Sequence, residues 1–163
     1  MKKFYNPSWV TFNSINTMVM EGETEFKLVY IKSGINELCD AFGAFDIMKG
    51  ISKKEGVNIT VEVIGYINIL DLLAIAHINK DNKIINPLSR ISFKGIKGSV
   101  GATAEEARVI KKHIRLEKEK LFTLLAEHYD PTADEFKTWN YEDYLMKSSD
   151  AVLIHNIFGG EIK

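Results

Sequence analysis

The chain has 163 residues, which is enough for one domain with a core of its own. Its 21 basic and 22 acidic side chains leave a formal net charge of −1, so the composition argues against nucleic acid or an anionic membrane as partner. The single cysteine, Cys39, cannot form an internal disulfide, which predicts a reducing compartment. No apolar run reaches the roughly 18 residues of a membrane span, and the first ten residues lack a signal-peptide core. We therefore expect one cytoplasmic domain over residues 1–163.

The N-terminal half of the sequence predicts alternating strands and helices. A strand over 25–33 leads into a helix over 36–50, in which four apolar residues repeat at helical spacing. In the strand predicted over 57–65, apolar and polar residues alternate, which indicates one buried face. The apolar positions are Leu38, Phe42, Phe45 and Met48 in the helix and Val57, Ile59, Val61 and Val63 in the strand.

Residues 63–77, VIGYINILDLLAIAH, have the pattern of a strand-to-helix turn. The strand ends near Gly65, and an apolar helix begins at about Leu70. Many hydrolases present a nucleophilic serine at such a turn, where a substrate can reach it. Here the residues between Gly65 and Leu70 are Tyr, Ile, Asn and Ile, and no serine or cysteine is among them.

The C-terminal half contains one long predicted helix over 104–129. Thr103 and Glu106 form a capping box at its start, and Asp130-Pro131 ends it. At 1.5 Å per residue such a helix spans about 40 Å, so we expect part of it to project and to pack against another subunit. Its apolar stripe at helical spacing consists of Ala107, Ile110, Ile114, Leu121 and Leu125.

Three shorter elements complete the predicted order. A short strand at 89–93 precedes the long helix, and a helix over 132–146 and a strand over 151–158 follow it. The elements alternate as β-α-β-α-β-α-α-β, so the fold class is α/β.

The titratable residues do not form a recognisable catalytic or metal-binding motif. The histidines are far apart in the sequence and none has a partner at metal-ligand spacing, which favours surface or helix-end positions for His77, His113, His128 and His155. The paired carboxylates of the long helix lie among lysines, so a solvated, salt-bridged face is predicted for Glu105, Glu106, Glu117 and Glu119. No metal is expected.

Two further features have structural readings. The GIKGSVG segment (95–101) has three glycines but lacks the Lys-Ser/Thr of a phosphate-binding loop, so no nucleotide cofactor is expected. Cys39 lies on the helix with the apolar face, which favours a packed thiol over a nucleophile.

Five stretches follow one another as in a known family. YIKSGINELCDAFGAFDIM (30–48) is similar to Y-I-N-S-P-G-G and a helix ending in Y-D-T-M, and 63–77 is similar to the segment around G-x-A-A-S-M-G-A. NPLSRISFKGIKGSVGAT (86–103) is similar to N-S-x-x-M-I-H-Q-P-x-G-G and the loop after it. Residues 113–139 fit the rest of a long handle helix, and EDYLMKSSDAV (142–152) is similar to D-x-F-L-S-A-x-E-A. The chain thus resembles the proteolytic subunit of the Clp peptidase, whose fold is close to the crotonases.

The resemblance implies a fold and an oligomer. The fold is a repeated β-β-α superhelix with a protruding handle helix over 103–130, and the oligomer is a ring of six or seven copies. The segment 1–29 is shorter than in the family. Residues 8–15 can serve as the family's first strand, and residues 16–25 are too short for its full first helix. No room is left for the axial loop, which argues against docking of an unfoldase. The interface side chains expected on the handle are Ile110, Ile114, Leu121 and Leu125.

The positions that carry catalysis in the family are occupied by other residue types here. Ile69 stands at the position of the nucleophilic serine, Ser92 at that of the histidine and Trp139 at that of the aspartate. Ile35 and Asn36 replace the glycine pair that lines the oxyanion hole. An isoleucine has no lone pair to activate, and a serine is no base near neutral pH. Carboxylates that a small slip in register could bring to the third position are Asp134, Glu142 and Asp143.

These departures predict a protein without peptidase activity. Its role would be that of an oligomeric structural or regulatory ring subunit, alone or mixed with active Clp-type subunits. One alternative is a crotonase-like or peptidase-like enzyme that uses relocated residues, with Asp71, Asn68 and Glu37 as candidates. A second alternative is a phage structural protein derived from a maturation peptidase.

Overall fold

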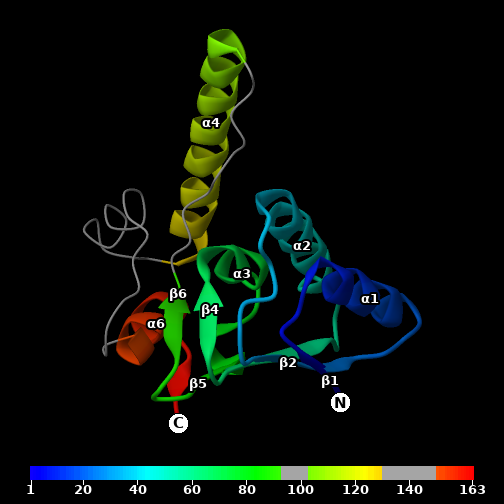
Figure 1. The fold of residues 1–163 in the computed structure, drawn as a ribbon. Helices are drawn as coiled ribbons and strands as arrows, with labels where there is room; N and C mark the ends of the chain where they lie inside the picture. Colours follow the sequence, from blue (N-terminus) through cyan, green and yellow to red (C-terminus); the bar gives the residue numbers. More distant parts are fainter. Residues whose placement is uncertain (93–102, 130–149) are drawn as a thin grey trace.

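The computed structural model describes residues 1–92, 103–129 and 150–163 (Figure 1). Its strands are β1 (Lys2–Tyr5), β2 (Glu25–Tyr30), β3 (Asn58–Val63), β4 (Tyr66–Asn68), β5 (Lys83–Ile85), β6 (Arg90–Ser92) and β7 (Glu161–Ile162). Its helices are α1 (Trp9–Met20), α2 (Leu38–Ile51), α3 (Ile69–Ala74), the 3-10 turn η1 (Lys80–Asn82), α4 (Ala104–His128) and α6 (Asp150–Phe158). The α/β class is confirmed.

Five parallel strands form the main sheet, in the order β1-β2-β3-β5-β7. The register places Tyr30 of β2 beside Val63 of β3, and Val63 beside Ile85 of β5. The strands therefore end at one common edge. A second sheet has two parallel strands, β4 and β6, and pairs Asn68 with Ser92.

The helices of the described residues pack on one face of the main sheet (Figure 1). Along β3 the predicted alternation is confirmed, because Ile59, Val61 and Val63 are buried while the residues between them are half-exposed. Side chains on successive strand positions point to opposite faces, so the buried set faces the helices. Phe26 and Leu28 of β2 continue this buried face.

The strand predicted over 8–15 is wrong, because these residues belong to helix α1. Phe12, Ile15 and Val19 recur three and four residues apart and are buried, which is a helical stripe. Ser8 begins the helix as N-cap in a capping box with Thr11. Its β-branched and aromatic residues favoured a strand locally, and packing against α2 decided for a helix.

The strand predicted over 151–158 is also wrong, because Asp150–Phe158 is helix α6. Ile154, Ile157 and Phe158 are buried, and Gly159 stops the helix at a φ of 67° that favours glycine. Strands β1, β4, β5 and β7 have no counterpart among the predicted elements. The helix predicted over 132–146 and the glycine-containing segment 95–101 lie outside the described residues.

The predicted long helix is confirmed as α4, with 25 residues. Thr103 and Glu106 form the predicted capping box, with Glu106 N donating to Thr103 Oγ1 at 3.2 Å. The C-terminal turns of α4 are anchored in the core by Leu121, Phe122 and Leu125. Its N-terminal turns extend away from the sheet (Figure 1). Among the described residues, no helix is both long and apolar enough to cross a membrane.

Candidate functional site

The predicted strand-to-helix turn exists, because β4 runs directly into α3 at Asn68 and Ile69. Asn68 caps α3: its side chain accepts a hydrogen bond from Asp71 N at 2.8 Å, and Asp71 Oδ2 accepts one from Asn68 N at 3.3 Å. Just before β4, the chain passes so close to β2 that a Cβ on Gly65 would lie 1.9 Å from the Ile31 carbonyl oxygen. Only glycine fits this approach.

The Asp71 carboxylate is the centre of the turn. It is fully buried, and besides Asn68 N it accepts from Ser33 Oγ at 2.6 Å, Gly34 N at 3.3 Å and Ile35 N at 3.0 Å. Asn68 Nδ2 also donates to the Ile35 carbonyl at 2.8 Å. Two consecutive backbone N–H groups that converge on a negative oxygen resemble the donors of an oxyanion hole. Here those donors are occupied by the chain's own carboxylate.

Burial raises the pKa of Asp71 to about 6, while the hydrogen bonds from Ser33, Ile35, Asn68 and Gly34 act in the opposite direction. The Tyr30 hydroxyl, also fully buried, has no hydrogen-bond partner among the described residues. Burial and the nearby Asp71 carboxylate raise the Tyr30 pKa well above its usual value. Both groups are therefore enclosed by protein and shielded from water.

The predicted triad and oxyanion positions are placed as follows. Ile69 is the first residue of α3 and only 4% exposed, so the position that would present a nucleophile holds a core side chain. The backbone of Ser92 pairs with that of Asn68, which makes positions 69 and 92 neighbours. Trp139 lies outside the described residues. Ile35 is buried and Asn36 exposed, and the N–H groups that bind Asp71 belong to Gly34 and Ile35, one position earlier than the predicted pair.

Of the relocated candidates, the structure brings Asp71 and Asn68 together, whereas Glu37 is exposed. Ser33 completes the cluster and was not found by sequence reasoning. The sequence contains a signal for one part of this cluster. Asn68 is followed three positions later by the Asp71 carboxylate, which is the spacing of a capping box.

Two of the four histidines meet, which their distance in the sequence did not indicate. The rings of His77 and His128 are 4.5 Å apart between centroids, and Phe45 lies against both. Burial and the neighbouring His128 lower the pKa of His77 to about 4, so its imidazole is neutral at physiological pH. Within the described ranges, no three metal-ligating side chains gather. His113 and His155 are exposed, as predicted.

Lys83 is a buried lysine that sequence reasoning missed. Its ammonium lies 4.3 Å from the ring centroid of Phe158 and 5.1 Å from that of Tyr129. Burial and the charge of Lys80 lower its pKa to about 7. The aromatic faces attract the cation but do not replace its lost hydration.

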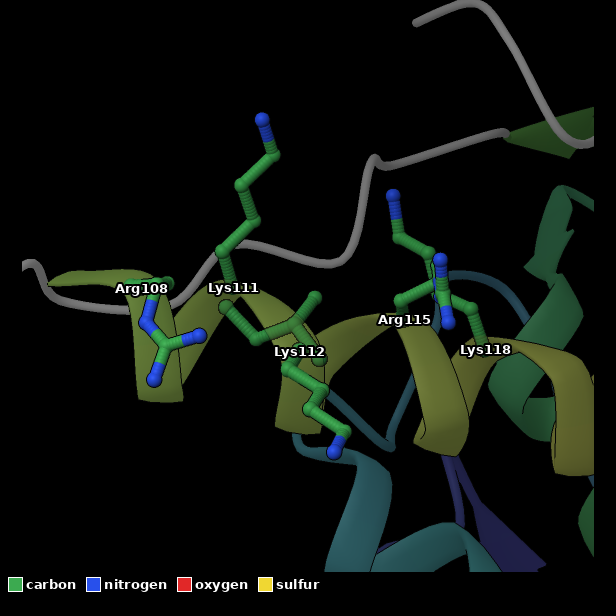
Figure 2. Close-up of a pocket in the computed structure, with 6 residues that line it drawn as sticks. Arg108, Lys111, Lys112, Arg115 and Lys118 are labelled. Carbon is green, nitrogen blue, oxygen red and sulfur yellow. The ribbon is translucent and has the colours of Figure 1, made fainter.

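A basic groove of about 470 Å³ runs along the projecting part of α4. Figure 2 shows the five cations that line it with Ile114, namely Arg108, Lys111, Lys112, Arg115 and Lys118. The ammonium groups of Lys111 and Lys112 point to opposite sides of the helix, so the cations do not converge on a single anion. Glu105 binds Arg108 at 2.8 Å and Glu119 binds Arg115 at 3.5 Å, which confirms the predicted salt-bridged face.

The predicted interface stripe of α4 divides into two parts. Leu121 and Leu125 are buried within this chain's own core, while Ile110 and Ile114 are partly exposed on the projecting turns. The prediction of a packed Cys39 is wrong: the residue is exposed at the start of α2, beside Glu37 and Asp40. Its pKa is raised, first by partial burial and then by the charge of Asp40.

No protein-family model matches the chain, and no curated protein matches it.

Proposed function

We propose that this protein is a catalytically silent relative of the Clp peptidase proteolytic subunit and acts as an oligomeric structural or regulatory ring subunit. One observation carries the proposal. The turn that would hold a nucleophile and an oxyanion hole contains the buried Ile69 instead, and the Asp71 carboxylate takes up the N–H groups of Gly34 and Ile35.

Acyl transfer requires an activated nucleophile and donors that are free to bind the developing oxyanion. The Ser33 hydroxyl is the hydroxyl in this cluster, and it donates to Asp71 Oδ2 at 2.6 Å. A carboxylate alone is a weak base for an alcohol, because the two pKa values lie far apart. A substrate carbonyl would also have to displace Asp71 from its buried position. The cluster therefore favours a structural role, which ties the loop after β2 to the start of α3.

The arrangement of elements supports the resemblance on which the proposal rests. Parallel strands, the strand-to-helix turn at Asn68 and Ile69 and the projecting helix α4 agree with the resemblance, whereas helices α1 and α6 stand where it predicts strands. Asn68 pairs with Ser92, so positions 69 and 92 are neighbours, which supports the proposed correspondence with the serine and histidine positions of the peptidase. On this proposal, the chain keeps the fold of the peptidase subunit and has lost its catalytic residues.

The alternative of an enzyme with relocated residues has less support. Asp71 has no exposed surface and accepts four hydrogen bonds from within the chain, and Asn68 is 2% exposed with both side-chain ends bonded. Groups committed in this way have no free atom to offer a substrate. Within the described residues, the Glu37 side chain forms no hydrogen bond with either of them.

Assembly is supported by the projecting turns of α4. Val109 and Leu116 are exposed there, and Ile110 and Ile114 are only partly covered. Apolar side chains gathered on a projecting helix are typical of subunit contacts. The resemblance to the Clp peptidase subunit implies rings of six or seven copies.

Two measurements on the purified full chain test the proposal. Treatment with a fluorophosphonate and a quenched peptide should give neither serine labelling nor turnover, and light scattering should give a mass several times 18.5 kDa. The Ile69→Ser variant should remain inactive, since no base adjoins the new hydroxyl. Stoichiometric labelling of a serine, with turnover that disappears when that serine is replaced, would contradict catalytic silence. A monomer at micromolar concentration would contradict the ring.

A further inference from the structure

Two histidines from distant parts of the chain pack against each other at the base of α4. The ring of His77, in the turn after α3, lies edge-on to that of His128, the last residue of α4, with 4.5 Å between centroids and 82° between ring planes. Phe45 of α2 lies against both rings, 4.5 Å from His77 and 5.2 Å from His128. The three rings therefore join α2, the turn after α3 and the C-terminal end of α4.

This packing suits neutral imidazoles. His128 Nδ1 donates to the Leu124 carbonyl oxygen at 2.9 Å, whereas His77 Nε2 is buried and has no hydrogen-bond partner among the described residues. A proton on His77 would place a charge against the Phe45 ring and beside a second imidazole. Two imidazolium ions at this separation would repel each other, because burial weakens the screening by water.

The charged groups around His77 come from α2, from the turn after it and from α4. Burial of the ring has the largest effect and lowers the pKa of His77, and His128 of α4 lowers it further. Lys49 of α2 and Lys53 after α2 act in the same direction, while Asp46 of α2 acts against them. Together they bring the pKa of His77 from 6.5 to about 4.

A cavity beside His77 offers the ring a second position. The cavity has a volume of about 240 Å³ and lies between the end of α2, the start of β3 and η1, with His77 in its wall. Its other polar lining residues are Ser52, Asn79 and Asn82. Because Asn82 Nδ2 donates to Asn58 Oδ1 at 3.1 Å, the Asn82 carbonyl oxygen points elsewhere and, like the Ser52 oxygen, can accept a hydrogen bond. The volume is several times the roughly 30 Å³ of a water molecule, so an imidazole fits.

We propose that the contact between His77 and His128 is an acid-sensitive latch at the base of α4. While both rings are neutral, the latch packs the last turn of α4 against α2 through Phe45. A proton on the pair turns the His77 ring into the cavity, where the oxygens of Ser52 and Asn82 accept its N–H groups. The proton shifts the population because it binds the open arrangement more tightly. The last turn of α4 then loses a packing partner and opens more readily.

The imidazole resonances of the full chain test the first step. In the wild type, His77 should titrate near pH 4 rather than near 6.5. His128→Gln should raise the pKa of His77, because a facing positive charge is removed while burial of the ring remains. His113→Gln is the matched control, since His113 is exposed on the same helix, and it should leave the titration of His77 unchanged.

Amide hydrogen exchange tests the second step. After correction for intrinsic rates, protection in the last turns of α4 relative to β3 should fall about three- to tenfold per pH unit from about pH 6 to 4.5, because opening takes up at most one proton. In His77→Gln this fall should disappear, since glutamine does not titrate, whereas His113→Gln should keep it. Asp71 has a pKa of about 6 and is present in every variant, so its contribution cancels in the comparison.

Several results would overturn the latch. One is a wild-type His77 that titrates near 6.5, since its ring would then already be hydrated. Another is protection in α4 that does not fall with acid, or that falls equally in the wild type and in His77→Gln. A fall that extends equally to β3 would mean that the whole chain unfolds, and it would count against the latch as well. The latch is a property of the single chain, so serine labelling and oligomer mass test the proposed function separately.

Discussion

At the scale of single residues, Asp71 links two parts of the chain that are far apart in sequence. Its carboxylate joins Ser33, Gly34 and Ile35 of the loop after β2 to the first turn of α3. A hydrogen bond to an ionised group contributes about 1.5–3 kcal/mol, and a buried donor left without a partner is costly. The position of the loop therefore depends on this one side chain.

Replacing Asp71 by alanine should lower the free energy of unfolding by about 2–4 kcal/mol, because several buried donors lose their acceptor. Asp71→Asn should cost less, about 1–2 kcal/mol, since the amide oxygen can accept from Gly34 and Ile35 while its NH₂ donates to the Ser33 oxygen, and only Asn68 N loses its acceptor. Urea unfolding measures both. Asp46→Asn, at an exposed position of α2, is the matched control. Equal losses for the alanine and asparagine variants would contradict this assignment.

Lys83 is held in the core by aromatic rings, and its folded-state pKa of about 7 lies below the 10.5 of a free lysine. The unfolded chain therefore binds more protons between these two values, so the contribution of Lys83 to stability falls as the pH falls from about 10 towards 7. Over that range the loss amounts to roughly 3 kcal/mol.

Lys83→Met should raise the free energy of unfolding at pH 7 by about 1–3 kcal/mol, because an apolar chain of similar length needs no hydration. The gain over wild type should shrink as the pH rises towards 9.5. Thermal unfolding at several pH values measures this, and Lys3→Met at an exposed position of β1 serves as control. A loss of stability at pH 7 would show that the aromatic contacts outweigh desolvation.

At the scale of elements, α4 consists of two parts with different environments. The Leu121 side chain is fully buried in the hydrophobic core, whereas Ile114 lies on a projecting turn seven residues earlier. A single apolar stripe in the sequence thus serves the core at one end and is available to other contacts at the other.

Leu121→Ala should lower the free energy of unfolding by about 2–5 kcal/mol, as expected for a cavity in the core. Ile114→Ala should cost less, about 1–2 kcal/mol in the monomeric state, since its side chain is only partly buried there. Denaturant titrations at low protein concentration distinguish the two. Similar costs at both positions would mean that the projecting turns are packed within the chain itself.

At the scale of the whole molecule, the apolar side chains of α4 that the proposed assembly would use are flanked by charged ones. The chain has a net charge of only −1, so copies repel one another little. Charges at the rim of an interface mainly affect the rate of encounter, while the apolar centre determines how long the complex lasts.

Raising the salt concentration from about 0.05 to 0.5 M should therefore change the concentration for half-assembly by less than about threefold, because salt screens only the rim charges. Light scattering over a dilution series at each salt concentration measures this. A loss of assembly at high salt would instead assign the contact to the basic groove of α4, where the exposed cations gather.

The sequence by itself determined the α/β class, the elements β2, α2, β3 and α4, and the absence of a nucleophile at Ile69. These features have local signals: alternation for a half-buried strand, spacing of three and four for a helix, and a capping box at its start. Only the tertiary structure decided that residues 9–20 and 150–158 are helices, because their β-branched residues favoured strands and packing against neighbouring elements prevailed. The three-residue strands β4 and β5 are too short to show a period, and parallel pairing joins segments distant in sequence. For the same reason the burial of Lys83, the meeting of His77 with His128 and the occupation of the Gly34 and Ile35 N–H groups by Asp71 depend on contacts that no local pattern encodes.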